Sequence, residues 1–94
     1  MEITVEFVGV ARVLTKTSKT VFQVSEGSSY QDILRKLGNE YPVLVDQMID
    51  MENGVFIGSN MFSKDGKKMI RPNEMKGSPK DGEHLILMSV LAGG

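Results

Sequence analysis

The first residues of the chain alternate between apolar and polar side chains. Within Glu2–Val8, the apolar side chains of Ile3, Val5 and Phe7 fall on one face, and the alternate positions up to residue 6 are polar. This period of two predicts a strand with one buried face. A second β-branched run, Thr20–Val24, follows a connection rich in Thr, Ser and Lys. The two segments therefore predict a hairpin with a long loop.

A helix is predicted between Ser28 and Pro42. Its apolar side chains recur every three or four residues and form one stripe, which consists of Tyr30, Ile33, Leu34, Leu37 and Tyr41. Ser28 or Ser29 can cap its start, and Ser28 with Gln31 matches a capping box. Pro42 ends the helix, because the residue before a proline avoids the α region.

The second half of the chain predicts short strands joined by turns. Val43–Met51 is compatible with either a short helix or a loop with apolar anchors, and Gly54–Gly58 is typical of a short strand. Asp65-Gly66 is a strong hairpin signal, and Asp81-Gly82 predicts a further turn. The final strand, Glu83–Val90, is almost continuously apolar, which favours burial on both faces in the centre of a sheet.

This order of elements predicts an α+β fold, the ubiquitin-like β-grasp. In that fold a mixed sheet carries one main crossover helix, and the C-terminal strand lies in the centre of the sheet, parallel to the first strand. We expect one β-grasp domain over residues 1–90. Residues 91–94, Leu-Ala-Gly-Gly, are expected to form a flexible tail, since glycine restrains the backbone least.

Composition excludes several classes of function. The 94 residues include 40% hydrophobic side chains and no cysteine, and the net charge is -1. The missing cysteine excludes disulfides, Cys-ligated metal sites and a thiol nucleophile, and the charge gives no reason to expect nucleic acid or an anionic membrane as a partner. No apolar run reaches the ~20 residues that span a bilayer, and the start lacks the pattern of a signal peptide. We therefore expect a cytoplasmic protein.

No catalytic set is visible, so we expect a protein that is not an enzyme and that holds no metal or cofactor. His84 is the single histidine, and a lone histidine in a strand is more often structural than catalytic. A basic cluster surrounds the Asp65-Gly66 turn and consists of Lys64, Lys67, Lys68 and Arg71. Such a cluster is typical of a solvated hairpin tip, and a contact for an acidic partner is the alternative.

The last two residues offer a different chemistry. Two terminal glycines arise by chance in about 1 chain in 200. Because Gly93 and Gly94 lack Cβ atoms, they can pass through a slot that is too narrow for other residues, and the Gly94 carboxylate is open to attack. The four residues after Val90 can extend by ~13–14 Å and so reach into a neighbouring protein's cleft. The alternative is a loose end without function.

Three segments of the chain resemble one known family. They are the start, Met1–Arg12 (MEITVEFVGVAR), the helix entry, Glu26–Pro42 (EGSSYQDILRKLGNEYP), and the end, Pro79–Gly94 (PKDGEHLILMSVLAGG). The family is that of the small subunit of molybdopterin synthase and the thiamine sulfur carrier, the MoaD/ThiS family. One departure is that Ser89-Val90 stand where the family has paired prolines.

The resemblance implies a ubiquitin-like sulfur carrier. In the family, an adenylating enzyme related to ubiquitin activators uses ATP to activate the terminal glycine carboxylate, and a sulfur donor then converts the acyl-adenylate into a thiocarboxylate. Carried over to this chain, Gly94 is the activated residue, and Gly93, Ala92 and Leu91 form the tail that a partner recognises. ATP is used by the partner, so the chain itself binds no cofactor.

The resemblance also implies a docking surface and leaves the acceptor open. Family partners, among them the large subunit of molybdopterin synthase, dock on apolar residues of the exposed sheet face. Phe7 and Met88 are the candidates by position, and ordinary core packing is the alternative for both. The sulfur would serve molybdopterin or tungstopterin, thiamine, or tRNA thiolation. A protein modifier joined through Gly94 to lysines of target proteins, and a noncovalent β-grasp interaction module, are the competing functions.

Overall fold

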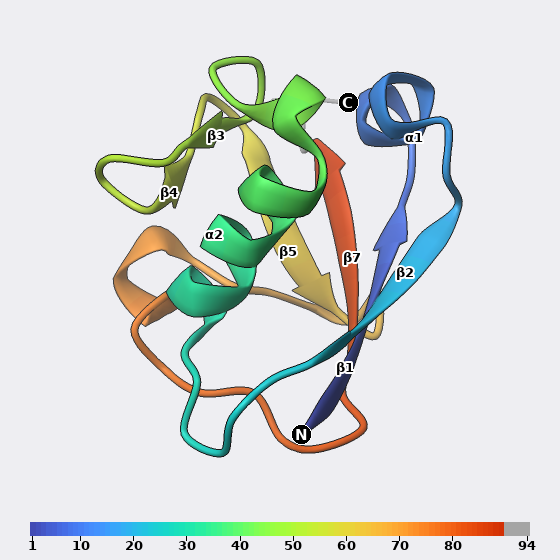
Figure 1. The fold of residues 1–94 in the computed structure, drawn as a ribbon. Coiled ribbons are helices and arrows are strands. Elements are labelled where there is room, and N and C mark those ends of the chain that lie inside the picture. The colour runs from blue at the N-terminus through green and yellow to red at the C-terminus, as the bar shows by residue number, and fades with distance from the viewer. Residues whose placement is uncertain (90–94) are drawn as a thin grey trace.

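The computed structural model describes residues 1–89, in which a helix lies across one face of a five-stranded sheet (Figure 1). The sheet strands are β1 (Glu2–Phe7), β2 (Lys19–Gln23), β5 (Asn60–Lys64), β6 (Lys68–Met69) and β7 (His84–Ser89). A separate two-stranded ribbon consists of β3 (Ile49–Asp50) and β4 (Val55–Phe56). The helices are α1 (Val10–Thr15) and α2 (Tyr30–Glu40), and two 3-10 turns are η1 (Pro42–Leu44) and η2 (Pro72–Glu74).

The sheet has the order β2-β1-β7-β5-β6, so the last strand lies in its centre. β1 is antiparallel to β2 and parallel to β7, and β5 is antiparallel to β7. A right-handed crossover through a helix is the usual route between parallel neighbours, and α2 lies on the chain between them. This topology confirms the predicted ubiquitin-like β-grasp with its central C-terminal strand.

The predicted face of β1 is confirmed, because Ile3, Val5 and Phe7 are all buried in the core. The connection that follows contains a helix, α1, which sequence analysis missed. Four of its six residues, Val10, Ala11, Val13 and Leu14, are apolar, but only the side chain of Ala11 is buried, and six residues are too few for a helical period to stand out. A helix of six residues is not stable alone, and tertiary contacts to η1 and β7 hold α1 in place.

The start of α2 differs by one residue from the predicted capping box. Ser29, not Ser28, caps the helix: its Oγ accepts a hydrogen bond from the Asp32 N–H at 3.0 Å, and the Asp32 carboxylate accepts one from the Ser29 N–H at 2.9 Å. Gln31 instead donates its side-chain amide to the carbonyl groups of Asn53 and Gly54. The predicted capping box of Ser28 with Gln31 is therefore wrong, because the Gln31 side chain is engaged by a distant loop instead.

The middle of the chain is irregular and was predicted only in part. Residues 43–51 form neither a helix nor a plain loop, because η1 ends within them and β3 follows. The short strand expected in Gly54–Gly58 is confirmed as β4. Asp65 and Gly66 both have positive φ, 53° and 71°, which is the backbone of a type I′ turn, and they join β5 to β6 as predicted.

The final strand is buried on one face only, which corrects the prediction of burial on both. Leu85 and Leu87 are fully buried beneath α2, whereas His84, Ile86 and Met88 point to the opposite face and are partly exposed. A continuous apolar run does not distinguish a strand buried on both faces from one that exposes apolar side chains on its outer face.

Candidate functional site at the end of the central strand

β7 ends at Ser89, the last residue that the structure describes; it pairs with β5 up to Ser89 and with β1 up to Leu87. Phe7 of β1 lies opposite Leu87, and Asn60 of β5 lies opposite Ser89. The hydroxyl groups of Ser59 and Ser89 are 3.1 Å apart. The point from which the chain continues into its last five residues is therefore fixed by both neighbouring strands.

The tail itself lies outside the described residues. This holds for residue 90 and for the four predicted site residues, Leu91, Ala92, Gly93 and Gly94. Their roles in activation and recognition, and the boundary between a domain and a flexible tail, stay predictions.

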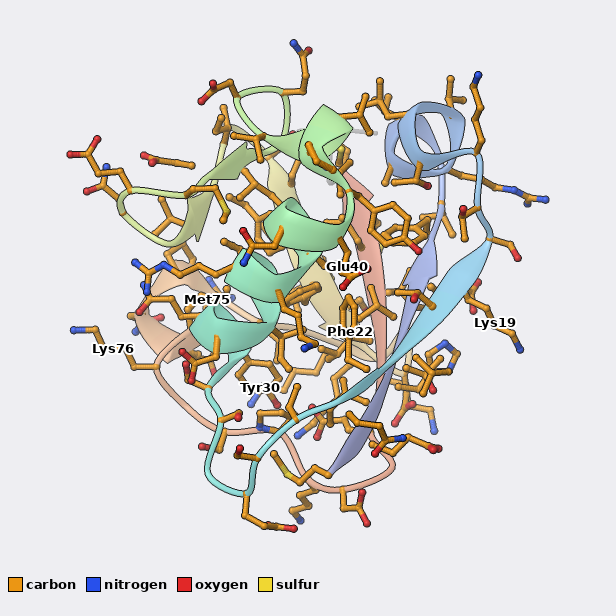
Figure 2. All side chains as sticks on the ribbon, viewed as in Figure 1. Lys19, Phe22, Tyr30, Glu40, Met75 and Lys76 are labelled. Atoms are coloured by element: carbon orange, nitrogen blue, oxygen red, sulfur yellow. The ribbon has the colours of Figure 1, made fainter. Side chains whose placement is uncertain are left out.

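The beginning of β7 is anchored by a buried carboxylate, that of Glu83, whose side chain is 5% exposed. The Tyr30 hydroxyl at the start of α2 donates to Glu83 Oε2 at 2.7 Å (Figure 2 shows Tyr30 beneath the helix). Lys64 Nζ lies 3.5 Å from Oε1, and the Lys80 N–H donates to the same oxygen at 3.3 Å. Burial, together with the hydrogen bond to Glu83 and its charge, raises the pKa of the Tyr30 hydroxyl well above its usual range. These contacts tie the strand to the helix and to β5.

Because the Tyr30 pKa is raised on folding, stability should fall in alkaline solution. Below about pH 10, both states keep the phenol proton and the contribution is complete; above it the unfolded chain ionises while the folded chain does not, so the free energy of unfolding decreases. Tyr30→Phe should cost about 1–3 kcal/mol at pH 7, because Glu83 loses a buried donor, and should flatten this decline. Urea unfolding followed by circular dichroism from pH 7 to 11 measures both effects, since the chain has no tryptophan. Tyr41→Phe is the matched control and should keep the decline; an equal slope in Tyr30→Phe would contradict the assignment.

His84 lies on the outer sheet face and contacts an acidic neighbour. Its Nε2 is 3.1 Å from Oε1 of Glu6, and both side chains are close to two-fifths exposed.

Within residues 1–89, no group of three or more His, Asp or Glu side chains is arranged to hold a metal ion. None of the helices in this part of the chain is long and apolar enough to cross a membrane.

The basic cluster around the β5–β6 turn is partly neutralised by acidic side chains. Lys64 contacts Glu83, and Lys68 Nζ lies 3.4 Å from Oε2 of Glu74. Two of the four basic residues therefore have an acidic partner within the fold. This arrangement favours the solvated hairpin tip over a docking contact for an acidic partner.

The two docking candidates lie on opposite faces of the sheet. Phe7 is 1% exposed, and its ring packs edge-on against Tyr41 with the centroids 5.2 Å apart. Its assignment as a docking residue is therefore corrected to a core residue; the alternation in β1 had already placed it on the buried face. Met88 is partly exposed on the outer face, opposite Met61 of β5. Its role in docking stays a prediction.

Several solved structures share this fold over nearly their whole length. Small archaeal modifier protein 1 (SAMP1) from Haloferax volcanii has a TM-score of 0.81 at 14% identity, with 100% of both chains covered. A candidate molybdopterin converting factor subunit 1 from Pyrococcus furiosus has 0.73 at 12%, covering 96% of this chain and 98% of that one. Urm1 from Trypanosoma brucei has 0.71 at 19%, covering 99% and 95%. No family profile and no curated protein sequence matches the chain. The TM-scores establish a shared fold, but sequence identities this low establish nothing beyond the fold, so function has to be argued from the chain itself.

Proposed function

We propose that this chain is a ubiquitin-like sulfur carrier whose working group is the Gly94 carboxylate. The observation that carries the proposal is the position of β7: the central strand of a β-grasp sheet is followed by five residues, of which the last two are Gly93-Gly94. The names of the structural neighbours, a small archaeal modifier and a candidate molybdopterin converting factor subunit, lend support to this class of function.

The chemistry requires activation because a carboxylate is a poor electrophile. An oxygen of the Gly94 carboxylate attacks the α-phosphorus of ATP, pyrophosphate leaves, and an acyl-adenylate forms. Hydrosulfide from the sulfur donor then attacks the acyl carbon, AMP leaves with the bonding electron pair, and loss of the sulfur-bound proton leaves a thiocarboxylate at the end of the chain. A ubiquitin-activator-like enzyme supplies the ATP site and a separate donor supplies the sulfur, so the chain itself acts as a substrate.

What the chain contributes is position and access. The strand that precedes the tail is paired on both sides and anchored through Glu83 at its beginning. Because this strand is already ordered, less conformational entropy is lost when the tail enters a partner. The two glycines keep the reacting carbon unhindered within a narrow slot. Because the activation uses ATP, we place the reaction in the cytoplasm.

The acceptor of the activated group distinguishes two versions of this function. Transfer of sulfur would serve the synthesis of molybdopterin or tungstopterin, of thiamine, or tRNA thiolation, with a partner such as the large subunit of molybdopterin synthase. Attack by a lysine amine on the same acyl group would instead give an isopeptide and make the chain a protein modifier. The name of the SAMP1 neighbour favours keeping this second candidate.

Intact mass spectrometry separates these functions. We expect that incubation with ATP, the adenylating enzyme of the same organism and a sulfide source shifts the mass of the chain by one oxygen-to-sulfur exchange. A ladder of heavier lysine conjugates in a lysate would identify the modifier. An unchanged mass, obtained with an enzyme that activates its own reference substrate, would contradict both and leave the noncovalent interaction module.

A further inference from the structure

Four exposed aliphatic side chains occur at the end of the molecule where β7 ends. Val10 and Val13 belong to α1 and are 57% and 75% exposed, Val43 in η1 is 45% exposed, and Ile57 in the turn before β5 is 37% exposed. We call these four residues the exit rim. The sequence predicted only a connection rich in Thr, Ser and Lys at Val10 and Val13, and the local pattern does not show that these apolar side chains stay exposed.

Three segments that are distant in sequence bring the exit rim together. α1 contacts both η1 and β7, and the Val8 N–H just before α1 donates to the Leu87 carbonyl at 3.3 Å. The turn before β5 approaches from the other side, where the hydroxyl groups of Ser59 and Ser89 meet and the Asn60 side chain donates to the Ile57 carbonyl at 2.7 Å. Figure 1 shows α1, η1 and the start of β5 around the arrowhead of β7.

The length of the remaining chain limits where a partner can act. Five residues separate Ser89 from the Gly94 carboxylate, and five extended residues span at most about 18 Å. A protein that reacts with this carboxylate therefore has its reaction centre within that distance of the end of β7. The wall around its cleft must then approach the elements that border Ser89, and these elements carry the exit rim.

The chemistry of the exit rim specifies what this wall should look like. Burying four aliphatic side chains against an apolar surface of a partner lowers the free energy of the complex, because it removes them from water. Arg12 and Lys16, which lie on and directly after α1, are exposed and form no ion pair with any residue up to Ser89. A complementary surface is therefore apolar at its centre and carries carboxylates opposite these two cations.

We propose that the exit rim docks on an apolar, acid-bordered surface at the mouth of the cleft in which the adenylating partner binds the tail. This inference rests on the proposed function and names the contact surface of that partner. The exit rim is distinct from the outer sheet face, where Met61 and Met88 lie. It holds the domain outside the cleft while the tail enters.

Steady-state kinetics of ATP–pyrophosphate exchange by the adenylating enzyme test this contact. Val10→Asp and Val13→Asp should each raise the KM for the carrier about 10-fold or more, as expected for a central interface residue, with kcat changed by less than about twofold. Val13→Ile keeps the apolar contact and should restore the normal KM. Arg12→Glu should raise the KM mainly at low salt.

Val21→Asp is the matched control: Val21 is 50% exposed and lies in the edge strand β2, opposite Thr4, which in turn pairs with His84 at the beginning of β7, away from its end. Its KM should stay within about twofold of the parent value, since an exposed site outside the contact contributes little. Thermal unfolding of each variant, followed by circular dichroism, verifies that the fold is kept.

The possible outcomes separate this inference from the proposed function. Normal exchange by the parent chain with unchanged KM values in the exit-rim variants overturns the inference and leaves the carrier function intact. No exchange by the parent chain overturns the carrier function. The docking step is then measured without chemistry, by calorimetric titration of the enzyme with a chain that ends at Ala92: binding that Val13→Asp removes supports the exit rim, and absent or unaffected binding overturns it. A dimer in sedimentation equilibrium that Val13→Asp dissociates would assign the surface to a second copy and also overturn the inference.

Discussion

A chain that ends at Ala92 should fold normally and lose activation by the adenylating partner. Removing Gly93-Gly94 withdraws the carboxylate by two residues, or about 7 Å of extended chain. Since a displacement of only 1 Å can cost about 100-fold in rate, we expect the exchange rate to fall at least about 1000-fold. The Tm should stay within about 4 °C of the parent value, because the two glycines that are removed have no side chains to bury. Pyrophosphate exchange and thermal unfolding measure the two quantities on the same sample.

Gly93→Ala and Gly94→Ala are the matched controls for this truncation. Both keep the carboxylate at its place in the chain and add one Cβ atom. They should bind the partner and react more slowly than the parent chain, because the added atom crowds the slot. If the chain ending at Ala92 still supported sulfur transfer or conjugation, the carrier and the modifier would both be wrong. If it unfolded, the division into a domain and a separate tail would be wrong.

Phe7 and Met88, both predicted from the sequence as docking candidates, should differ strongly in how much they contribute to the free energy of unfolding. Phe7→Ala should lower the free energy of unfolding by about 3–5 kcal/mol, because it leaves a cavity beside Tyr41 in a fully buried part of the core. Met88→Ala removes a partly exposed side chain on the outer face and should cost less than about 1 kcal/mol. Urea unfolding followed by circular dichroism gives both values.

For the KM of the adenylating enzyme the order should be the reverse of that for stability: a Met88 variant should change it and a conservative Phe7 variant should not. Met88→Asp places a charge on the outer sheet face, where a partner is predicted to dock, and should raise the KM of the adenylating enzyme; an unchanged KM would contradict the predicted role of Met88. Phe7→Leu largely keeps the core volume and should leave the KM unchanged. A raised KM in a stably folded Phe7→Leu variant would contradict the assignment of Phe7 to the core.

Elements with a local periodic signal could be predicted from the sequence. The alternation in β1 and the stripe of α2 each repeat over a whole element, and Asp65-Gly66 carries its own turn geometry. Features that depend on distant partners could not be predicted. The choice of Ser29 as the cap and the short helix α1 depend on contacts made only in the folded chain. The partial exposure of the outer face of β7 could not be predicted either, because an apolar run in the sequence does not indicate which face of the strand other elements cover.

For the candidate site, the sequence by itself supplied the basis of the proposed chemistry, which is the pair Gly93-Gly94 shortly after an apolar strand. The tertiary structure decided which surface surrounds the point where that strand ends. α1, η1 and the turn at Ile57 meet there although up to 47 residues separate Val10 from Ile57. A local pattern records the period of a single element, whereas the neighbours of an element follow from how the whole chain buries its apolar surface.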